Sequence, residues 1–406
     1  MNLKFALSLS AGMLALGLSA AQAQEPLKIG VVSVLTGPAA ALGQQVRDGF
    51  QLAVDQNGGK LGGVPVQITI IDDELKPDVA VGKVRSFVEG GKVDFVVGPV
   101  FSNILGAIAK PVLDSGAILI SPNAGPSTMA GKACHQNFFV TSYQNDQVHE
   151  VLGKYAQDQN YKKAYIIAPN YQAGKDSLAG FKRYFKGEVL DEVYVPLTSL
   201  DFSAELAKIA SAKPDVVFAF LPGGLGVNFV KQWSQAGLTG KVPFLSAFTV
   251  DESTLPAQQD AAVGMFGGMT WAPNMDNPQT KKFVAAYEAA YKIVPGSYAQ
   301  QAFDAAQLID SAVKAAGGTG DKDKLRAALK KADFTSLRGK FKFNTNGYPI
   351  QDFYLVKVAK RPDGKFQTEI AQVKVAKRPD GKFQTEIAQK VFTDYADPHA
   401  KDCALK

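Results

Sequence analysis

The sequence has few of the residues from which most enzyme active sites are built. Its 406 residues include only three histidines, at positions 135, 149 and 399, and two cysteines. The histidines lack the spacing of metal ligands, and we expect His149, which lies in a predicted helix, to have a surface position. Because histidine is a common general base and metal ligand, this scarcity argues against both kinds of site.

Motifs of the common enzyme classes are missing as well. The sequence contains no dinucleotide-binding glycine motif, no serine-hydrolase nucleophile elbow and no zinc-protease motif. Gly174-Lys175 resembles the end of a phosphate-binding loop, but Asp176 stands where Ser or Thr must hold Mg²⁺. We therefore expect a protein that is not an enzyme and that has no metal site and no cofactor.

No charge of one sign dominates the chain. There are 44 Lys+Arg and 38 Asp+Glu residues, which is a formal net charge of +6. The basic residues are spread along the chain and lack the basic stripe with interleaved aromatic residues that nucleic-acid binding requires. We expect a soluble monomer with no nucleic-acid partner.

Long hydrophobic runs are absent outside the N-terminal segment. There, Lys4 precedes the apolar run 5–20, and Ala21-Gln22-Ala23 has the small-x-small form of a signal-peptidase site. A membrane anchor is the alternative, but the run is shorter than the roughly 18 residues that span a bilayer, and no cysteine follows the cleavage site to carry a lipid. We predict that residues 1–23 are a signal peptide, cleaved after Ala23, and that the protein is exported.

The two cysteines, Cys134 and Cys403, lie 269 residues apart. In an exported protein, an isolated pair of cysteines is most simply a disulfide. Two free thiols are the alternative, but they would be unusual after export. We predict a disulfide that ties the C-terminal tail to the segment at which the chain leaves its first domain.

Short apolar runs alternate with amphipathic segments over most of the chain. Continuous apolar runs are typical of strands buried on both faces of a parallel sheet. The first unit has predicted strands at 28–35, 64–71, 93–97 and 117–120, with helices ending before Asn57 and covering 78–89 and 104–113. The second has strands at 163–168, 189–195, 215–221 and 243–246, with helices at 146–159, 174–185, 204–212 and 227–235. This alternation predicts two α/β lobes with parallel sheets.

Three turns of small residues follow strands of the first unit, at 35–39, 98–103 and 121–125. Open parallel sheets bind small molecules beyond the carboxyl ends of their strands, where free N–H groups and helix N-termini face an anion. We interpret the three turns as one wall of a ligand cleft between the lobes. The last third of the chain has predicted helices at 281–292, 298–316 and 322–331, and segments 339–344 and 353–359 that we expect to be edge strands.

One segment is duplicated. Residues 356–372 read VKVAKRPDGKFQTEIAQ, and residues 373–389 repeat them without a change. Each copy has strand residues on either side of Arg-Pro-Asp-Gly, which predicts a hairpin. An added ribbon for a partner is one interpretation, but zero divergence favours a recent duplication without function. We predict that one copy occupies the hairpin's place and the other forms a surface excursion.

Four motifs, in this order and spacing, resemble the type I periplasmic binding proteins of the leucine/isoleucine/valine-binding family. They are KIGVVSVLTGPAAALG (28–43), DDELKP (72–77), VVGPVFS (96–102) and ISPNAGPS (120–127). The resemblance implies two Rossmann-like lobes joined by three crossovers, hinge closure over a small ligand, and delivery to an inner-membrane ABC permease. We expect an N-terminal lobe of residues 24–143 and 275–350 and a C-terminal lobe of residues 144–274 and 351–406, in the periplasm.

The resemblance also carries over an anion site. In branched-chain amino acid binders, the ligand carboxylate is held by a Ser hydroxyl and by donors of an S-P-A-A-T loop. Ser102 matches that Ser, and Asn123, Ala124 and Gly125 match the A-A-T positions. The family Thr hydroxyl is absent at Gly125, so its N–H, or the side chain of Asn123 or Ser127, is the expected donor. For Ser102 a plain N-cap role is the alternative, and the two roles are compatible.

The departures from the family pattern point to the ligand. The acidic residue that holds the α-ammonium group aligns with Phe248, although nearby Asp251 is an alternative. A buried ammonium without an anionic partner would be costly by several kcal/mol. A free amino acid is therefore disfavoured.

The remaining predicted site residues give the cleft its apolar and aromatic character. Two family aromatics align with Leu42 and Pro222, while Phe101, Tyr171 and Tyr298 offer other rings. Rings facing an apolar slot with an anion hole at one end suit a planar aromatic carboxylate. The chain resembles the branch of the family that binds benzoate-type and hydroxycinnamate-type acids. A branched-chain amino acid or amide binder, or a ligand-sensing partner of a membrane receptor, are the alternatives.

Overall fold

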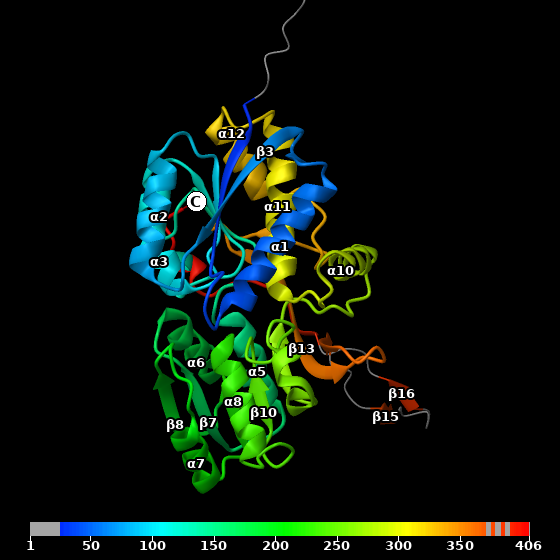
Figure 1. Cartoon of the computed structure of the whole chain (residues 1–406). Helices are drawn as coiled ribbons and strands as arrows, with labels where there is room; N and C mark the ends of the chain where they lie inside the picture. Colours follow the sequence, from blue (N-terminus) through cyan, green and yellow to red (C-terminus); the bar gives the residue numbers. More distant parts are fainter. Residues whose placement is uncertain (1–24, 371–374, 378–382, 386–389, 406) are drawn as a thin grey trace, which may run out of the picture.

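Two lobes, one above the other in Figure 1, are built on separate sheets in this computed structural model. The residues that the structure describes are 25–370, 375–377, 383–385 and 390–405, so the predicted signal peptide lies outside them. The chain passes between the lobes after β6, after β11 and on entering β13. The predicted α/β class with two lobes and three crossovers is confirmed.

The N-terminal lobe contains a six-stranded sheet of order β2-β3-β1-β4-β5-β6, parallel except for the β2–β3 pair. The strands are Leu27–Ser33 (β1), Lys60–Leu61 (β2), Val64–Asp72 (β3), Phe95–Val97 (β4), Ile118–Ser121 (β5) and Phe138–Val140 (β6). Residues of β1, β4 and β5 are almost wholly buried, as continuous apolar runs predict.

Helices cover both faces of this sheet (Figure 1). The pair α2 and α3 packs on one side, and α1 packs against α11 on the other. The helices are Ala40–Gln56 (α1), Pro77–Glu89 (α2), Ser102–Asp114 (α3), Ser127–Ala130 (α4), Pro278–Tyr291 (α10), Ser297–Ala316 (α11) and Lys322–Lys331 (α12). The late helices α10 to α12 thus return to the lobe formed by the start of the chain.

The C-terminal lobe is built on a nine-stranded sheet whose main path runs β12-β13-β11-β10-β9-β7-β8, with β14 and β17 paired to β13. Only β12 lies with the N-terminal lobe, where Phe343 packs on Phe139 of β6. The strands are Lys163–Pro169 (β7), Glu188–Val195 (β8), Val216–Ala219 (β9), Phe244–Ser246 (β10), Phe266–Met269 (β11), Lys342–Phe343 (β12), Pro349–Lys360 (β13), Phe366–Ile370 (β14) and Lys390–Tyr395 (β17). Its helices are Gln147–Asp158 (α5), Gln172–Tyr184 (α6), Ser203–Ala212 (α7), Gly224–Gln235 (α8) and Leu255–Gln258 (α9).

One strand prediction needs correction, and strand β11 had no prediction. The segment expected as an edge strand at 353–359 belongs to β13, which has β11 on one side and β14 and β17 on the other. Strand β11 was not predicted, because its Phe-Gly-Gly-Met sequence looks like a turn. A Cβ at Gly268 would lie 2.0 Å from the main-chain oxygen of Val148, so glycine allows α5 to pack closely on this strand.

The duplicated segment takes two different positions. In the first copy, β13 and β14 form the predicted hairpin, with Val358 opposite Thr368. In the second copy, Val375–Lys377 (β15) and Phe383–Thr385 (β16) pair with the same register, Val375 opposite Thr385. They form a separate two-stranded sheet beside the lobe (Figure 1). One copy therefore occupies the hairpin's place, as predicted; the rest of the second copy lies outside the described residues.

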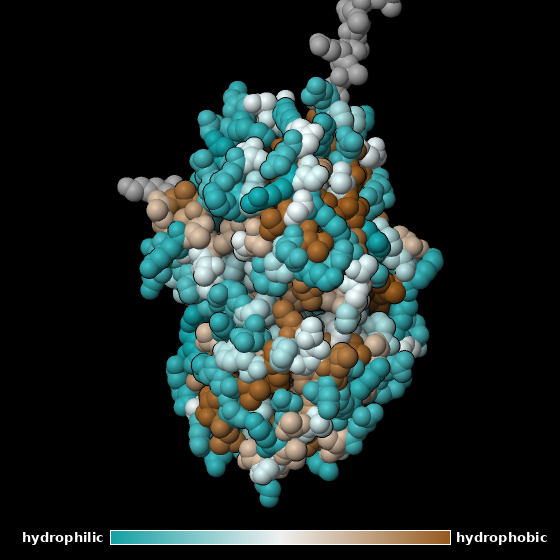
Figure 2. All heavy atoms as spheres, turned by 60° about the vertical axis from the view of Figure 1, so that its left-hand side comes forward, coloured by the Kyte–Doolittle hydropathy of each residue, from teal (hydrophilic) through white to brown (hydrophobic). Residues whose placement is uncertain are grey.

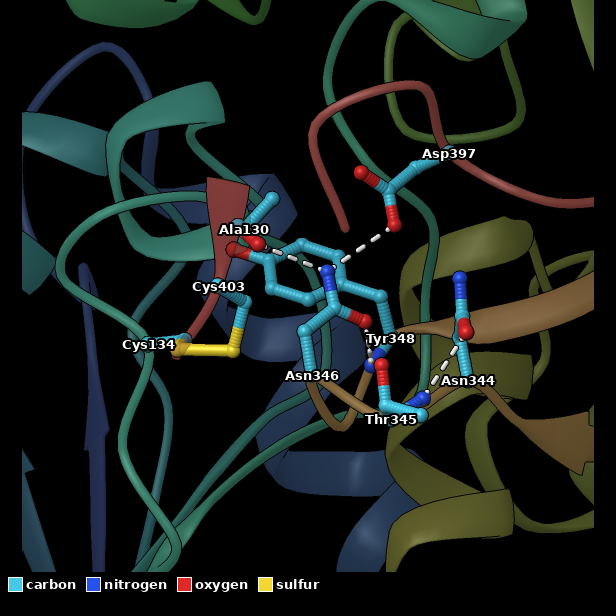
Figure 3. Close-up of a disulfide and its surroundings, with 8 residues drawn as sticks. All are labelled: Ala130, Cys134, Asn344, Thr345, Asn346, Tyr348, Asp397 and Cys403. Carbon is cyan, nitrogen blue, oxygen red and sulfur yellow. Dashed lines mark hydrogen bonds between the residues drawn. A yellow bond between two sulfur atoms is a disulfide. The ribbon is translucent and has the colours of Figure 1, made fainter. Parts of the chain in front are cut away.

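The C-terminal tail returns to the N-terminal lobe after β17. Cys403 forms the predicted disulfide with Cys134, with a Cα–Cα distance of 5.6 Å. Beside it, Asn346 donates to the main-chain oxygen of Ala130 (2.7 Å) and to Asp397 (3.0 Å) (Figure 3). The covalent bond and these hydrogen bonds hold the tail against the segment at which the chain leaves this lobe.

Candidate ligand-binding site

A small cavity of about 20 Å³ lies where the strand ends of the two lobes meet. The cavity brings together Leu42, Phe101, Ser102, Asn123, Ala124, Tyr171, Pro222, Phe248 and Tyr298, whereas the expected donors Gly125 and Ser127 do not line it. It is also lined by Val100 of the predicted turn 98–103 and by residues that the sequence did not indicate: Tyr143, Asn145, His149, Ala173 and Phe220. A larger hollow of about 620 Å³ belongs to the N-terminal lobe alone.

Ser102 is the first residue of α3, not its N-cap, and its side chain is buried. Its Oγ accepts a hydrogen bond from Nδ2 of Asn145 (3.1 Å), which leaves the hydroxyl proton free to be donated. The first helical hydrogen bond runs from Leu105 to Phe101 (3.0 Å), so the N–H groups of residues 102–104 precede it. This end of α3 therefore combines a hydroxyl donor with the positive end of a helix dipole.

Asn145 positions this donor, and it was missed because it lies in the crossover between the lobes. Its Nδ2 also donates to Asp176 of α6 (2.9 Å), and its Oδ1 accepts from the N–H of Gly125 (3.0 Å). With both Nδ2 protons used, Asn145 presents a donor to Ser102 and so orients the Ser102 hydroxyl. No feature of the sequence marks this residue, because the contact depends on how the crossover lies against α3.

The loop after β5 differs in detail from the expected anion site. The N–H of Gly125, an expected ligand donor, is bonded to Asn145, and a Cβ at this position would lie 2.0 Å from the main-chain oxygen of Tyr143. That close approach explains why a threonine does not fit here. Asn123 does line the cavity, but its Nδ2 donates to the oxygen of Val100 (2.7 Å) and its Oδ1 accepts from Tyr143 (3.2 Å).

Aromatic rings form most of the remaining wall. Tyr143 and Phe248 stack with ring centroids 5.4 Å apart and planes 17° apart, and Phe248 meets the edge of Tyr298 at 5.4 Å. Tyr171 lies 6.0 Å from Phe101. Phe248 also has a φ of 61°, a conformation unusual for a bulky residue and often found at functional sites.

Among the described residues, no Asp, Glu, Lys or Arg side chain lines the cavity. Asp251, the alternative partner for an ammonium group, is buried in the loop after β10 and accepts from the N–H of Ser253 (2.7 Å). Burial raises the pKa of Asp251, although bonds from Ser253 and Thr254 oppose the shift. The wall of the cavity is therefore neutral, with hydroxyl, amide, imidazole and ring groups.

His149 does not have the surface position expected from the sequence. It is 2% exposed and lines the cavity from α5, against Phe218 and Phe220. The helical pattern of 146–159 was recognised, but α5 is covered on several sides because β11 and β13 pack on it. The burial of His149 depends on strands that lie far along the chain, and the local sequence around His149 gives no sign of this packing.

The lobes are in direct contact around this cavity. The N–H of Gly224, at the start of α8, donates to the main-chain oxygen of Pro38 in the other lobe (3.0 Å). Ser127 donates through its Oγ to Asp176 (2.7 Å), again between lobes. A groove of about 320 Å³, lined from both lobes and more apolar than the cavity, adjoins the cavity at Phe101. Figure 2 shows hydrophobic side chains in the band where the lobes meet.

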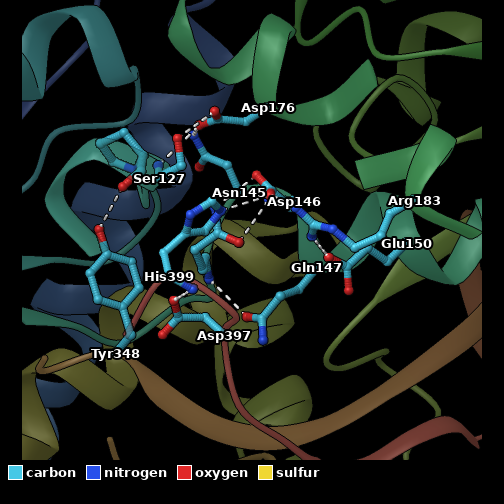
Figure 4. A network of polar contacts seen from close by, with 12 residues as sticks. Ser127, Asn145, Asp146, Gln147, Glu150, Asp176, Arg183, Tyr348, Asp397 and His399 are labelled. Atoms are coloured by element: carbon cyan, nitrogen blue, oxygen red, sulfur yellow. Dashed lines mark hydrogen bonds and ion pairs between the residues drawn. The ribbon is translucent and has the colours of Figure 1, made fainter. Parts of the chain in front are cut away.

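A charged network surrounds Asp146, at the end of the crossover from β6 to α5 (Figure 4). Asp146 accepts from Arg183 of α6 (2.7 Å) and pairs with His399 of the tail (3.0 Å). Burial opposes ionisation of Asp146, but the bonds from His399, Gln144 and Arg183 prevail and lower its pKa. Arg183 also pairs with Glu150. The network joins the tail, the crossover and the C-terminal lobe near the hinge.

Neither a metal centre nor a membrane span is found within the part of the chain that the structure describes. Its His, Cys, Asp and Glu side chains form no group of three or more that could hold a metal ion. Its helices include none long and apolar enough to cross a bilayer.

Two lobes that enclose a buried, neutral cavity between their strand ends have the arrangement of a protein that binds a small ligand between them. The family model for periplasmic binding proteins matches residues 26–365. The chain therefore belongs to the periplasmic binding protein family, and its function is that of an ABC-type solute-binding protein rather than of an enzyme. The predicted family resemblance is thereby confirmed.

Individual relatives agree with this assignment. Leu/Ile/Val-binding protein homolog 6 of Brucella melitensis biotype 1 is 29% identical over 372 residues, covering 88% of this chain and 93% of the relative. A solute-binding protein of an ABC transporter from R. palustris in complex with benzoate has a TM-score of 0.80 and 34% identity, covering 85% of this chain and 95% of that one. Another solute-binding protein, from Rhodopseudomonas palustris BisB5 in complex with 3,4-dihydroxy benzoic acid, has a TM-score of 0.81 and 27% identity. The match covers 92% of this chain and 99% of that one.

Proposed function

We propose that this protein captures a small aromatic monocarboxylate in the periplasm and delivers it to an inner-membrane ABC permease. The observation that carries the proposal is the chemistry of the cavity wall, in which neutral donors and aromatic rings occur without a carboxylate side chain among the described residues. A carboxylate ligand suits the N-terminus of α3 and the hydroxyl of Ser102. Export by the predicted signal peptide is part of the same proposal.

The aromatic part of the ligand would lie among the rings of the cavity. A planar ligand between two parallel rings needs centroids roughly 7 Å apart, twice a van der Waals contact of about 3.5 Å. Tyr143 and Phe248 are 5.4 Å apart, and the enclosed space is about 20 Å³. A ligand ring between these two side chains would therefore require Phe248, on the C-terminal lobe, to move away from Tyr143 as the lobes separate.

The order of contacts follows from the position of each donor. The ligand carboxylate would first meet Ser102 and the cavity-lining residues Asn123 and Ala124 on the N-terminal lobe. Tyr171, Phe248 and the turn at 222–224 would then close over the ring from the other lobe. Because only the closed form makes both sets of contacts, ligand binding would shift the protein towards closure.

The relatives support a carboxylate ligand but differ in its kind. Two similar solved proteins bind benzoate and 3,4-dihydroxy benzoic acid, whereas the curated relatives carry Leu/Ile/Val-binding names. The neutral wall favours the first kind, because an amino acid's ammonium group would lack an anionic partner in the described part of the cavity. A branched-chain amino acid or amide ligand, or a role in ligand sensing with a membrane receptor, are the alternatives.

A thermal-shift panel on the mature protein tests the ligand class. We expect benzoate and hydroxybenzoates to raise the unfolding midpoint, because a ligand that binds only the native state stabilises it, and we expect leucine and valine to have no effect. A shift with leucine alone would contradict the proposal and would make Asp251 the ammonium partner. Loss of aromatic-acid uptake on deletion of the gene would favour transport over sensing.

The anion site is tested by Ser102→Ala. Loss of a hydrogen bond to a charged group costs about 1.5–3 kcal/mol, so the dissociation constant for benzoate should rise roughly 10- to 100-fold in isothermal titration calorimetry. The matched control is Ser115→Ala, at the C-terminal end of the same helix, where Oγ donates to the oxygen of Val112 (2.7 Å). Equal affinities of the two variants would show that Ser102 does not hold the carboxylate.

A further inference from the structure

The imidazole of His149 lines the cavity beside the ring of Phe220. It meets the edges of Phe220 (5.0 Å between centroids) and Phe218 (5.6 Å), and its Nδ1 is buried without a hydrogen-bond partner in the described structure. A buried polar atom without a partner costs about 1–3 kcal/mol. Native proteins contain few such atoms, and each calls for an explanation.

Packing alone does not explain a histidine here. An aliphatic or aromatic residue would fill the space beside Phe218 and Phe220 without the cost of a lone polar atom. Burial lowers the pKa of His149 to about 3, although Asp146 opposes the shift. The ring is therefore neutral at physiological pH, with one nitrogen that donates and one that accepts.

A neutral imidazole selects among ligand groups. A second carboxylate or an ammonium group on the ligand would need a charged partner, which His149 does not offer in its neutral form. A hydroxyl both donates and accepts, so it pairs with either tautomer of the ring. An unsubstituted ring would leave the imidazole unpaired.

We infer that His149 binds a hydroxyl group on the aromatic ring of the ligand, so that the preferred class is the hydroxylated aromatic monocarboxylates. This inference rests on the proposed function. Ser102 on α3 of the N-terminal lobe and His149 on α5 of the C-terminal lobe would then hold opposite ends of one ligand. The hydroxyl would thereby contribute to closure as well as to specificity.

Calorimetry with benzoate, 3-hydroxybenzoate and 4-hydroxybenzoate measures the preference directly. We expect wild type to bind one of the hydroxybenzoates roughly tenfold more tightly than benzoate, the value of about one hydrogen bond. In His149→Leu this ratio of dissociation constants should fall to about one, and in His149→Gln, which keeps a donor and an acceptor, part of it should return. His135→Leu is the matched control, because it makes the same replacement at a histidine that does not line the cavity and should keep the ratio.

The failures of the two proposals are distinguishable. If no aromatic acid binds wild type, the proposed function fails. If benzoate binds as tightly as both hydroxybenzoates, or if His149→Leu keeps the wild-type ratio, only the role of His149 is overturned.

A measurement on wild type covers the case in which the variants do not fold. The chain has three histidines, so nitrogen-15 NMR can resolve their rings, with His135 and His399 as internal references. We expect the ring nitrogens of His149 to shift with the preferred hydroxybenzoate by more than with benzoate. Equal shifts with both ligands would overturn the inference.

Discussion

Glu252 should make the stability of this protein fall as the pH rises. It lies in the loop after β10, is 3% exposed, and accepts from both the N–H (2.6 Å) and the Oγ1 (2.7 Å) of Thr368 in the first copy of the repeat. Across the lobe interface is Gly296, where a Cβ would lie 3.2 Å from Oε2 of Glu252. Burial raises the pKa of the carboxyl from 4.5 to about 7, although the Thr368 bonds oppose this.

The sign and size of the effect follow from proton linkage. Between pH 4.5 and 7 the unfolded chain loses the Glu252 proton while the folded protein retains it, so folding becomes less favourable as the pH rises. The difference between the folded and unfolded pKa values lowers the free energy of unfolding by roughly 3 kcal/mol over the whole titration. Roughly 2 kcal/mol of this loss occurs between pH 5 and pH 8. Glu252→Gln keeps an oxygen to accept from Thr368 and removes the titration.

Urea unfolding at pH 5 and pH 8 checks this prediction. Glu252→Gln should gain stability over wild type as the pH rises, by roughly 2 kcal/mol across this range. Glu369→Gln, on strand β14 next to Thr368, makes the same replacement without touching the Glu252 carboxyl and is the control with which the Glu252→Gln variant is compared. Parallel pH curves for wild type and Glu252→Gln would refute the reasoning.

Three further predictions concern the disulfide, the tail and closure. Replacing both Cys134 and Cys403 by Ser should lower stability by up to roughly 5 kcal/mol, from the loop of 269 residues; unchanged urea midpoints would contradict this. The bond to Asp146 raises the pKa of His399 above 6.5, so its stabilisation is full below pH 6.5 and is lost as the pH rises through the raised pKa. The difference in the free energy of unfolding between wild type and His399→Ala should therefore narrow towards pH 9. A difference that stays constant with pH would refute this prediction. Gly224→Val places a Cβ 2.7 Å from a side-chain atom of the opposite lobe and should weaken benzoate binding roughly tenfold; calorimetry showing equal affinity would exclude this role.

Local patterns in the sequence determine much of the fold. Continuous apolar runs such as 28–35 predict strands buried on both faces, and β1, β4 and β5 have this burial. The turns after these strands carry Phe101 and Ser102, which line the cavity, because parallel strands end at one edge of the sheet. The disulfide was predictable for a simpler reason, since an exported chain with two cysteines has one possible pair.

The tertiary structure alone decided the rest of the site. Asn145 and Tyr143 lie in a crossover, where position relative to α3 depends on how the lobes are placed and not on periodicity. His149 is buried by β11 and β13, which lie more than a hundred residues further along the chain. Gly125 lost its expected role because a neighbouring main-chain oxygen and Asn145 occupy its surroundings. Sequence determines which residues end strands and begin helices, whereas contacts between distant segments determine which polar atoms are already paired and which face the ligand.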